Sequence, residues 1–189
     1  IQAYDGVMIS GSPASVHDAD PWIATLFDLI RHIYAQDIPL FGACFGHQAI
    51  AMALGGKVGP NPNGWVFGLT HSEILHKTTW MQDMPKTLKQ YGAHIEQVTI
   101  LPENAVMLSA NEACLNTGFH IAGTVYTTQN HPEMTPEFMA ALVAEYAKKL
   151  PTDVAKAAQS SLTEGADTEA YAESIARFFQ SAKIPLSHV

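Results

Sequence analysis

The sequence predicts an α/β fold: an open, mainly parallel sheet with helices on both faces. Over residues 4–54, two short β-rich runs alternate with two stretches of helical periodicity. This alternation is typical of a parallel sheet that is covered by helices. Five later runs of apolar and β-branched residues predict further strands, at 65–69, 95–101, 105–109, 119–121 and 123–129.

The first four elements follow from local signals. A strand is expected over residues 4–10 and a helix directly after Asp20, because Asp is a good N-cap and Pro21 suits the first helical turn. Apolar residues then recur at helical spacing and predict one buried face, at Ile23, Leu26, Phe27, Ile30, Ile33 and Tyr34. The second strand, 38–41, leads into a second helix over 47–54, which a pair of glycines ends.

The later helices are separated by a stretch without a clear pattern. Thr135 and Pro136 repeat the signal of a cap followed by proline, and open a helix that runs through Lys149. After Pro151 the composition shifts to Ala, Ser, Thr and Glu. Residues 152–166 are therefore expected to be weakly structured.

A last amphipathic helix is expected after Asp167, which can cap it. Its apolar stripe comprises Tyr171, Ile175, Phe178 and Phe179. We expect this stripe to pack on the domain or on a second subunit, which leaves a homodimer open. Residues 1–150 are accordingly assigned to the main domain and residues 151–189 to a C-terminal extension with one amphipathic helix.

Charge and composition exclude several classes of function. The formal net charge is −8 and no Lys/Arg cluster occurs, which argues against binding of nucleic acid or an anionic membrane. No run of 18 apolar residues is present, so no transmembrane helix is expected. No spacing of His and Cys is typical of a metal site, and no phosphate loop with its Lys is found, so neither a metal nor a cofactor is expected. The two cysteines form no C-x-x-C pair, which favours a reducing compartment, the cytoplasm.

The segment Gly42-Ala43-Cys44-Phe45-Gly46 joins the second strand to the second helix. A strand, a tight turn of small residues and a helix, with a thiol at the turn, is the pattern of a nucleophile elbow in which cysteine replaces serine. The thiol of Cys44 would lie at a helix N-terminus, where the dipole and the free N–H groups favour the thiolate. Cys44 is therefore the candidate nucleophile.

A thiolate nucleophile needs a base, and the base needs a group that orients it. His131 and Glu133 are the candidates, because they lie two residues apart at the end of the strand 123–129 and can project to one side. Pro132 between them stiffens the pair. The N–H of Phe45 and an N–H of the turn at Gly11 or Ser12 are the expected oxyanion donors.

Taken together, these residues resemble the class I glutamine amidotransferase family. The matching pieces are three and occur in family order: Ile9-Ser10-Gly11-Ser12-Pro13, Gly42 to Gln48, and His131-Pro132-Glu133. The likeness is greatest to stand-alone proteins similar to the amidotransferase domain of GMP synthase. It implies a flavodoxin-like fold, and a Cys44-His131-Glu133 triad that hydrolyses the glutamine side-chain amide through a glutamyl thioester. It also implies that Gln48 helps to bind the substrate, and that the segment 94–98 lines the site.

Two features depart from the family pattern. The residue before the catalytic histidine is often aromatic in the family, and here it is Asn130. Family members also begin with a strand and a helix that precede the run 4–10. Because that strand is central to the sheet, and because the chain given starts at Ile1, we expect a longer polypeptide.

The motifs leave three functions open. The first is hydrolysis of glutamine, with the ammonia passed to an acceptor or to a synthetase partner. The second is a γ-glutamyl peptidase that uses the same triad on a γ-glutamyl peptide. The third is a non-catalytic, flavodoxin-like binding or regulatory module.

Overall fold

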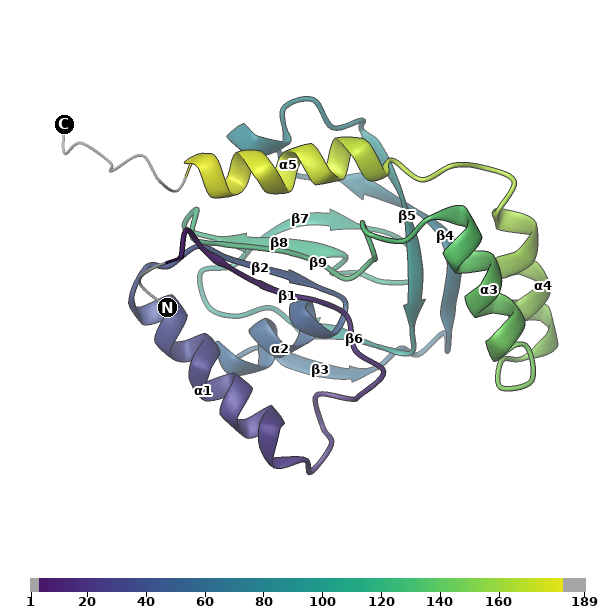
Figure 1. The fold of residues 1–189 in the computed structure, drawn as a ribbon, viewed down its shortest axis with the longest axis horizontal. Helices are drawn as coiled ribbons and strands as arrows, with labels where there is room; N and C mark the ends of the chain where they lie inside the picture. The colour runs from purple at the N-terminus through teal and green to yellow at the C-terminus, as the bar shows by residue number, and fades with distance from the viewer. Residues whose placement is uncertain (1–3, 182–189) are drawn as a thin grey trace.

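A computed structural model describes residues 4–181, and within them nine strands form two sheets (Figure 1). The strands are β1 Val7–Ile9, β2 Leu40–Ala43, β3 Lys57–Pro60, β4 Val66–Ile74, β5 Thr87–His94, β6 Glu96–Ile100, β7 Val106–Ala110, β8 Gly118–Ile121 and β9 Val125–Thr128. The helices are α1 Pro21–Ala35, α2 Phe45–Ala53, α3 Pro136–Tyr146, α4 Thr152–Ser161 and α5 Thr168–Ser181, with a short 3₁₀ helix at Thr79–Met81. None of the helices in this part of the chain is both long enough and apolar enough to cross a membrane.

The main sheet has the strand order β1-β2-β9-β8-β7-β4-β5, and β3 pairs with β6 in a separate two-stranded sheet. The α/β class is confirmed, but parallel pairing is limited to β1 with β2 and β2 with β9. The other strand pairs of the main sheet are antiparallel, so the expectation of a mainly parallel sheet is corrected. The reason is the short connections: β8 and β9, for example, are joined by residues 122–124 alone, which leaves no room for a crossover helix.

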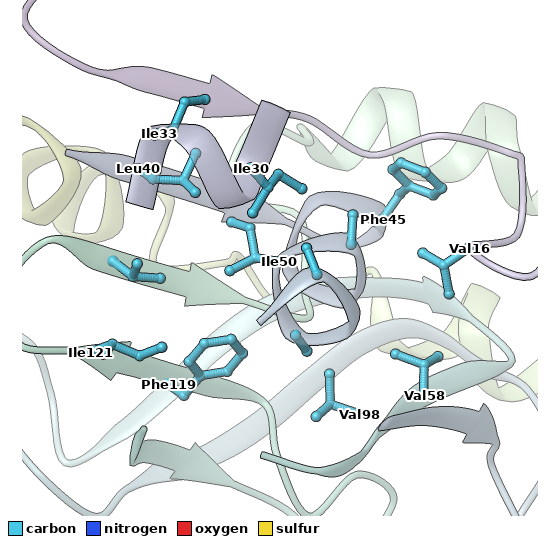
Figure 2. Packing of buried hydrophobic residues seen from close by; sticks show 14 residues of the cluster. Val16, Ile30, Ile33, Leu40, Phe45, Ile50, Val58, Val98, Phe119 and Ile121 are labelled. Carbon is cyan, nitrogen blue, oxygen red and sulfur yellow. The ribbon is translucent and has the colours of Figure 1, made fainter. Parts of the chain in front are cut away.

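Helices cover both faces of the sheet, as expected. On one face, α1 and α2 pack against the central strands, and Figure 2 shows Ile50 of α2 between Ile30 of α1 and Phe119 of β8. On the other face, α5 lies along the sheet (Figure 1), with Tyr171 and Phe178 buried against it. The apolar stripe of the last helix therefore packs on its own domain.

The segment 152–166 is not weakly structured, because α4 occupies most of it. This helix lies against β4, where Gly68 leaves room for it: a Cβ at Gly68 would lie 2.8 Å from the Cα of Ala158. The N–H of Leu69 donates to the Oγ of Ser161 at 2.9 Å. The sequence signal was weak because Ala158 is the only buried residue of a mostly polar helix.

The sheet also contains a long hairpin of β4 and β5, and the sequence analysis predicts only the start of its first strand. The run 65–69 was expected as a strand, but β4 extends to Ile74 and pairs with β5, which was not anticipated. At the opposite edge, β1 pairs with β2 alone within the described residues. A further strand beside β1 therefore stays a prediction.

Candidate active site

Cys44 lies at a strained turn between β2 and α2. Its backbone has φ 49° and ψ −105°, a conformation that costs a non-glycine residue on the order of 1–3 kcal/mol. The turn is held on both sides, because the Cys44 N–H donates to the carbonyl of Thr128 at 2.9 Å and the Cys44 carbonyl accepts from the N–H of Gln48 at 3.1 Å. Gly46 permits this packing, since a Cβ there would lie 2.2 Å from the carbonyl oxygen of Ile9. The expected strand, turn and helix are therefore present.

His131 and Glu133 follow β9 and meet as a pair. The Nδ1 atom of His131 lies 2.7 Å from Oε1 of Glu133, and the His131 N–H donates to the carbonyl of Tyr91 on β5 at 2.8 Å. The imidazole is buried, whereas about half of the Glu133 side chain is exposed. The carboxylate thus fixes the orientation of a ring that is otherwise enclosed by protein.

Gly11 brings the loop after β1 to the same point. A Cβ at Gly11 would lie 2.7 Å from Cε1 of His131 and 3.6 Å from the Cβ of Cys44. These distances place the loop directly against the ring of His131 and close to the Cβ of Cys44. The absence of a side chain at residue 11 is what allows this approach.

The electrostatics of the pair favour imidazolium. Burial by itself lowers the pKa of His131, but hydrogen bonds to Cys44 and Glu133 and their negative charges outweigh it and raise this pKa to about 10. Burial raises the pKa of Glu133, but its hydrogen bond to His131 outweighs this effect, so the pKa lies below its usual value. At neutral pH, His131 therefore carries a proton that it can donate.

One cavity of about 1020 Å³ contains every residue that the sequence predicted for the site: Gly11, Ser12, Cys44, Phe45, Gln48, His131 and Glu133. Phe45 is the first residue of α2, so its N–H is among those without an acceptor inside the helix. Gln48 is buried, and its Nε2 donates to the carbonyl of Glu96 at 2.9 Å and to Oε1 of Gln129 at 3.2 Å.

The cavity also has lining residues that sequence reasoning missed. His94 and Glu96, at the junction of β5 and β6, lie in the segment 94–98 that the family likeness pointed to without assigning a residue. Nδ1 of His94 donates to the carbonyl of Glu96 at 2.9 Å, and burial lowers the pKa of His94 to about 4, so this ring is neutral. The carboxylate of Glu96 accepts from the hydroxyl of Ser15 at 2.7 Å, which ties the loop after β1 to the cavity.

Neither Asn130 nor a group of metal-ligating side chains extends the candidate site within the described residues. Asn130 is buried but does not line the cavity. In the described part of the chain, no three side chains of the types His, Cys, Asp and Glu are grouped so that they could hold a metal ion.

Comparison with known proteins identifies the family. Residues 1–146 match the family model described as glutamine amidotransferase class-I. The chain belongs to the class-I glutamine amidotransferase family. The matched region ends at the last residue of α3, so it includes the whole cavity.

Relatives within the class-I glutamine amidotransferase family differ in name. The chain is 30% identical over 149 residues to gamma-glutamyl peptidase 3 of Arabidopsis thaliana, a match that covers 76% of this chain and 60% of that protein. It is 30% identical over 132 residues to a glutamine-hydrolyzing GMP synthase subunit of Methanosarcina acetivorans, which covers 69% of this chain and 65% of that protein. The match therefore spans about three fifths of the length of these relatives.

Solved structures share the fold. A glutamine amido transferase from Methylobacillus flagellatus superposes with a TM-score of 0.74 at 23% identity, over 96% of this chain and 78% of the other. A glutamine amidotransferase from Thermotoga maritima also gives a TM-score of 0.74, at 22% identity, over 92% and 78% of the two chains. The mixed sheet with helices on both faces is thus the fold of this family.

Proposed function

We propose that this member of the class-I glutamine amidotransferase family hydrolyses the side-chain amide of glutamine through a glutamyl thioester on Cys44. The observation that carries the proposal is that Cys44 and His131 line one cavity and interact there, while Glu133 lies 2.7 Å from the ring of His131. A cysteine at a helix N-terminus beside a protonated imidazole is the environment that favours a thiolate. Family membership supports the same chemistry.

In the first half of the proposed reaction, the Cys44 thiolate attacks the γ-carbonyl carbon of glutamine. The N–H groups of Phe45 and of the turn at Gly11 and Ser12 stabilise the oxyanion. His131 donates its proton to the leaving nitrogen as the C–N bond breaks, so ammonia departs and the thioester remains.

In the second half, neutral His131 removes a proton from water as the water attacks the thioester. The C–S bond then breaks, glutamate leaves, and the Cys44 thiolate and the His131 imidazolium are restored. Glu133 holds the imidazole in one orientation throughout. The relative that is named as part of a GMP synthase supports transfer of the ammonia to an acceptor on a synthetase partner.

Gln48 and Glu96 are proposed to hold the amino-acid end of the substrate. Both line the cavity, and the carbonyl of Glu96 fixes the side-chain amide of Gln48 at 2.9 Å. The Glu96 carboxylate supplies the negative charge that an α-ammonium group requires. In glutamine and in γ-glutamyl compounds this group lies the same number of bonds from the γ-carbonyl, so the contact is proposed to select both.

Hydrolysis of γ-glutamyl peptides is the second candidate. The relatives named gamma-glutamyl peptidases favour it, and so does the cavity volume of about 1020 Å³, because cavities of roughly 300–1,000 Å³ hold ligands much larger than glutamine. The chemical steps would be the same, with an amine in place of ammonia as the leaving group.

A glutaminase assay with matched cysteine variants tests the proposal. Cys44→Ala is expected to abolish ammonia release, whereas Cys114→Ala keeps it, because Cys114 is a buried thiol outside the cavity whose pKa burial raises to about 11. Equal hydrolysis by wild type and Cys44→Ala would show that the nucleophile is assigned wrongly. Labelling by a chloroketone analogue of glutamine tests Cys44 even where a synthetase partner is needed for turnover. A non-catalytic module would show no labelling faster than that of an ordinary exposed thiol.

A further inference from the structure

We propose that the preferred substrate is a γ-glutamyl amide whose leaving group is apolar, aromatic and uncharged. The proposal rests on the γ-glutamyl chemistry of the proposed function, which glutamine and γ-glutamyl peptides share, and specifies the leaving group that the cavity prefers to ammonia. It is carried by an apolar wall inside the cavity, which consists of Trp65, Phe67, Phe138, Leu142 and Tyr146.

The apolar wall is built by two elements. Phe138, Leu142 and Tyr146 are spaced four residues apart on α3, which places them on one face of that helix. Trp65 directly precedes β4, and Phe67 is the second residue of that strand. The rings join the two elements, with centroid distances of 5.6 Å from Phe67 to Tyr146 and 6.4 Å from Trp65 to Tyr146.

Anchoring of α3 explains only part of the apolar wall. Met139 and Val143 hold the helix in a buried apolar cluster, and Phe67 and Leu142 of the wall pack against that cluster. Trp65, Phe138 and Tyr146 are not among the residues of this cluster. Phe138, in contrast, is 56% exposed although it lines the cavity. When an apolar ligand covers a large apolar side chain that faces a cavity, the free energy of the complex is lowered.

The chemistry of the reaction places the leaving group on the side of the apolar wall. His131 must reach the leaving nitrogen to protonate it, so the leaving group lies beside His131. The chain continues from His131 into α3, which begins at Pro136 and carries Phe138 in its first turn. Gln48 and Glu96, which are proposed to hold the amino-acid end, come from α2 and the start of β6. Because Phe67 pairs with Ala93, close to Glu96, the α3 part of the wall at Phe138 is the part assigned to the leaving group.

The charges of the lining favour an uncharged leaving group. Among the described residues that line the cavity there is no Lys or Arg, while Glu96 and Glu133 are both present. The ammonium of Lys149 lies 4.7 Å from the centre of the Tyr146 ring, but Lys149 is not part of the lining. The His131 imidazolium also lines the cavity, but it is already paired with Glu133 and Cys44. A carboxylate on the leaving group would therefore lose water without gaining an unpaired cation.

The proposed step forms a thioester between Cys44 and the γ-carbonyl carbon as the C–N bond breaks. The leaving nitrogen takes the proton of His131 and departs as an aromatic or arylalkyl amine. Water then cleaves the thioester to glutamate, as in the glutamine reaction, so no oxidant or other reactant is required.

Three substrates separate the possibilities: glutamine, γ-glutamyl-phenethylamide, and γ-glutamylphenylalanine, which has the same ring and an added carboxylate. We expect wild-type kcat/KM for the phenethylamide to exceed that for each of the other two by about 10-fold or more. Phe138→Ala is expected to lower kcat/KM for the phenethylamide about 10-fold and to leave that for glutamine within twofold. Leu115→Ala, a matched truncation of an exposed residue outside the cavity, is expected to change neither.

Each contrary result has one meaning. A preference for glutamine or γ-glutamylphenylalanine, or an equal loss on all substrates in Phe138→Ala, would overturn the role of the apolar wall and leave the proposed function standing. Hydrolysis of none of the substrates, together with no labelling of Cys44 by the chloroketone analogue, would overturn the proposed function instead. In that case calorimetric binding to Cys44→Ala still decides the inference, because the apolar wall requires the phenethylamide to bind more tightly than glutamine.

Discussion

Substitution of Gly11 by alanine is expected to disable the site while leaving the fold intact. The added Cβ would lie 2.7 Å from Cε1 and 3.3 Å from Nδ1 of His131. Carbon atoms in ordinary contact are about 3.5–4.0 Å apart, so either the ring or the loop must move by about 1 Å. Gly11 is partly exposed in the loop after β1, so this movement does not disturb the core.

Either movement removes something that the proposed reaction needs. If the ring moves by about 1 Å, it lengthens the 2.7 Å contact between His131 and Glu133 beyond hydrogen-bonding range. If the loop moves instead, it withdraws the N–H groups of Gly11 and Ser12 from the oxyanion. A misplacement of about 1 Å costs on the order of 10²-fold in rate, and loss of one oxyanion donor costs about 10²–10³-fold. We therefore expect kcat to fall by at least about 100-fold.

The measurement is kcat and KM for glutamine together with the melting temperature. Gly165→Ala is the matched control, because a Cβ at Gly165 meets no atom within 4 Å and its φ is not in the left-handed region. We expect both variants to melt within about 3 °C of wild type and only Gly11→Ala to lose activity. Retention of more than half of the wild-type kcat by a folded Gly11→Ala would refute the placement of this loop in the reaction.

Three further predictions concern charge, pH and packing. Glu133→Gln is expected to lower kcat more than about 10-fold and to leave KM within about threefold of the wild-type value, because the His131 imidazolium loses its counter-charge. An effect on KM alone would contradict the orienting role of Glu133. His47 and His94 are buried with pKa values lowered by burial to about 3 and about 4, below the value of about 6.5 in the unfolded chain. The unfolded state therefore binds more protons, and the free energy of unfolding should fall by roughly 1.4 kcal/mol per pH unit for each histidine from pH 6 to 5. Burial also lowers the pKa of His120, so His47→Gln should remove only the His47 share, roughly 1.4 kcal/mol per pH unit, from the slope measured in urea titrations. An unchanged slope would contradict the assignment. Phe178→Ala should lower the free energy of unfolding by about 3–5 kcal/mol, because the ring of Phe178 is fully buried against Trp80 and Tyr126. The activity per folded molecule should be unchanged. A loss of stability below about 1 kcal/mol in denaturant titrations would show that α5 does not pack as described.

The parts of the site that could be predicted from the sequence are those encoded locally. The turn at Cys44 needs small residues between a buried strand and a helix, and all of these signals lie within ten residues of one another. The pair of His131 and Glu133 is likewise a short motif at a strand end. Such signals survive in a single sequence because no distant contact is required to interpret them.

The parts that could not be predicted depend on distant pairing. Glu96 enters the cavity because β6 pairs with β3 and because Ser15, 81 residues away, donates to its carboxylate. The strand β5 was missed because its residues mix charged, polar and apolar types without alternation, while its position is set by its pairing with β4. Helix α4 was missed because Gly68 on β4, and not its own apolar face, provides the space in which it packs.

The limited extent of parallel pairing explains how one sheet can serve both the proposed reaction and the proposed choice of substrate. Each of the three parallel strands delivers one part of the proposed catalytic machinery at its C-terminal end: β1 the loop at Gly11, β2 Cys44, and β9 His131. Their register sets the alignment, because Ile9 pairs with Gly42 and Ala43 with Thr128, so the three ends reach the same edge together.

The antiparallel half contributes β4 with Phe67 and β5 with Tyr91, whose carbonyl fixes the backbone of His131 at 2.8 Å. A change in the register of β1, β2 or β9 by one residue would separate the thiol from the imidazole, because it reverses the face on which every side chain lies. A side-chain change at Phe67 or along the cavity face of α3 leaves that alignment untouched and alters only the surface that meets the leaving group. Substrate preference can therefore vary within this fold without loss of the reaction, which fits relatives of similar identity that are named for a peptidase and for a synthase.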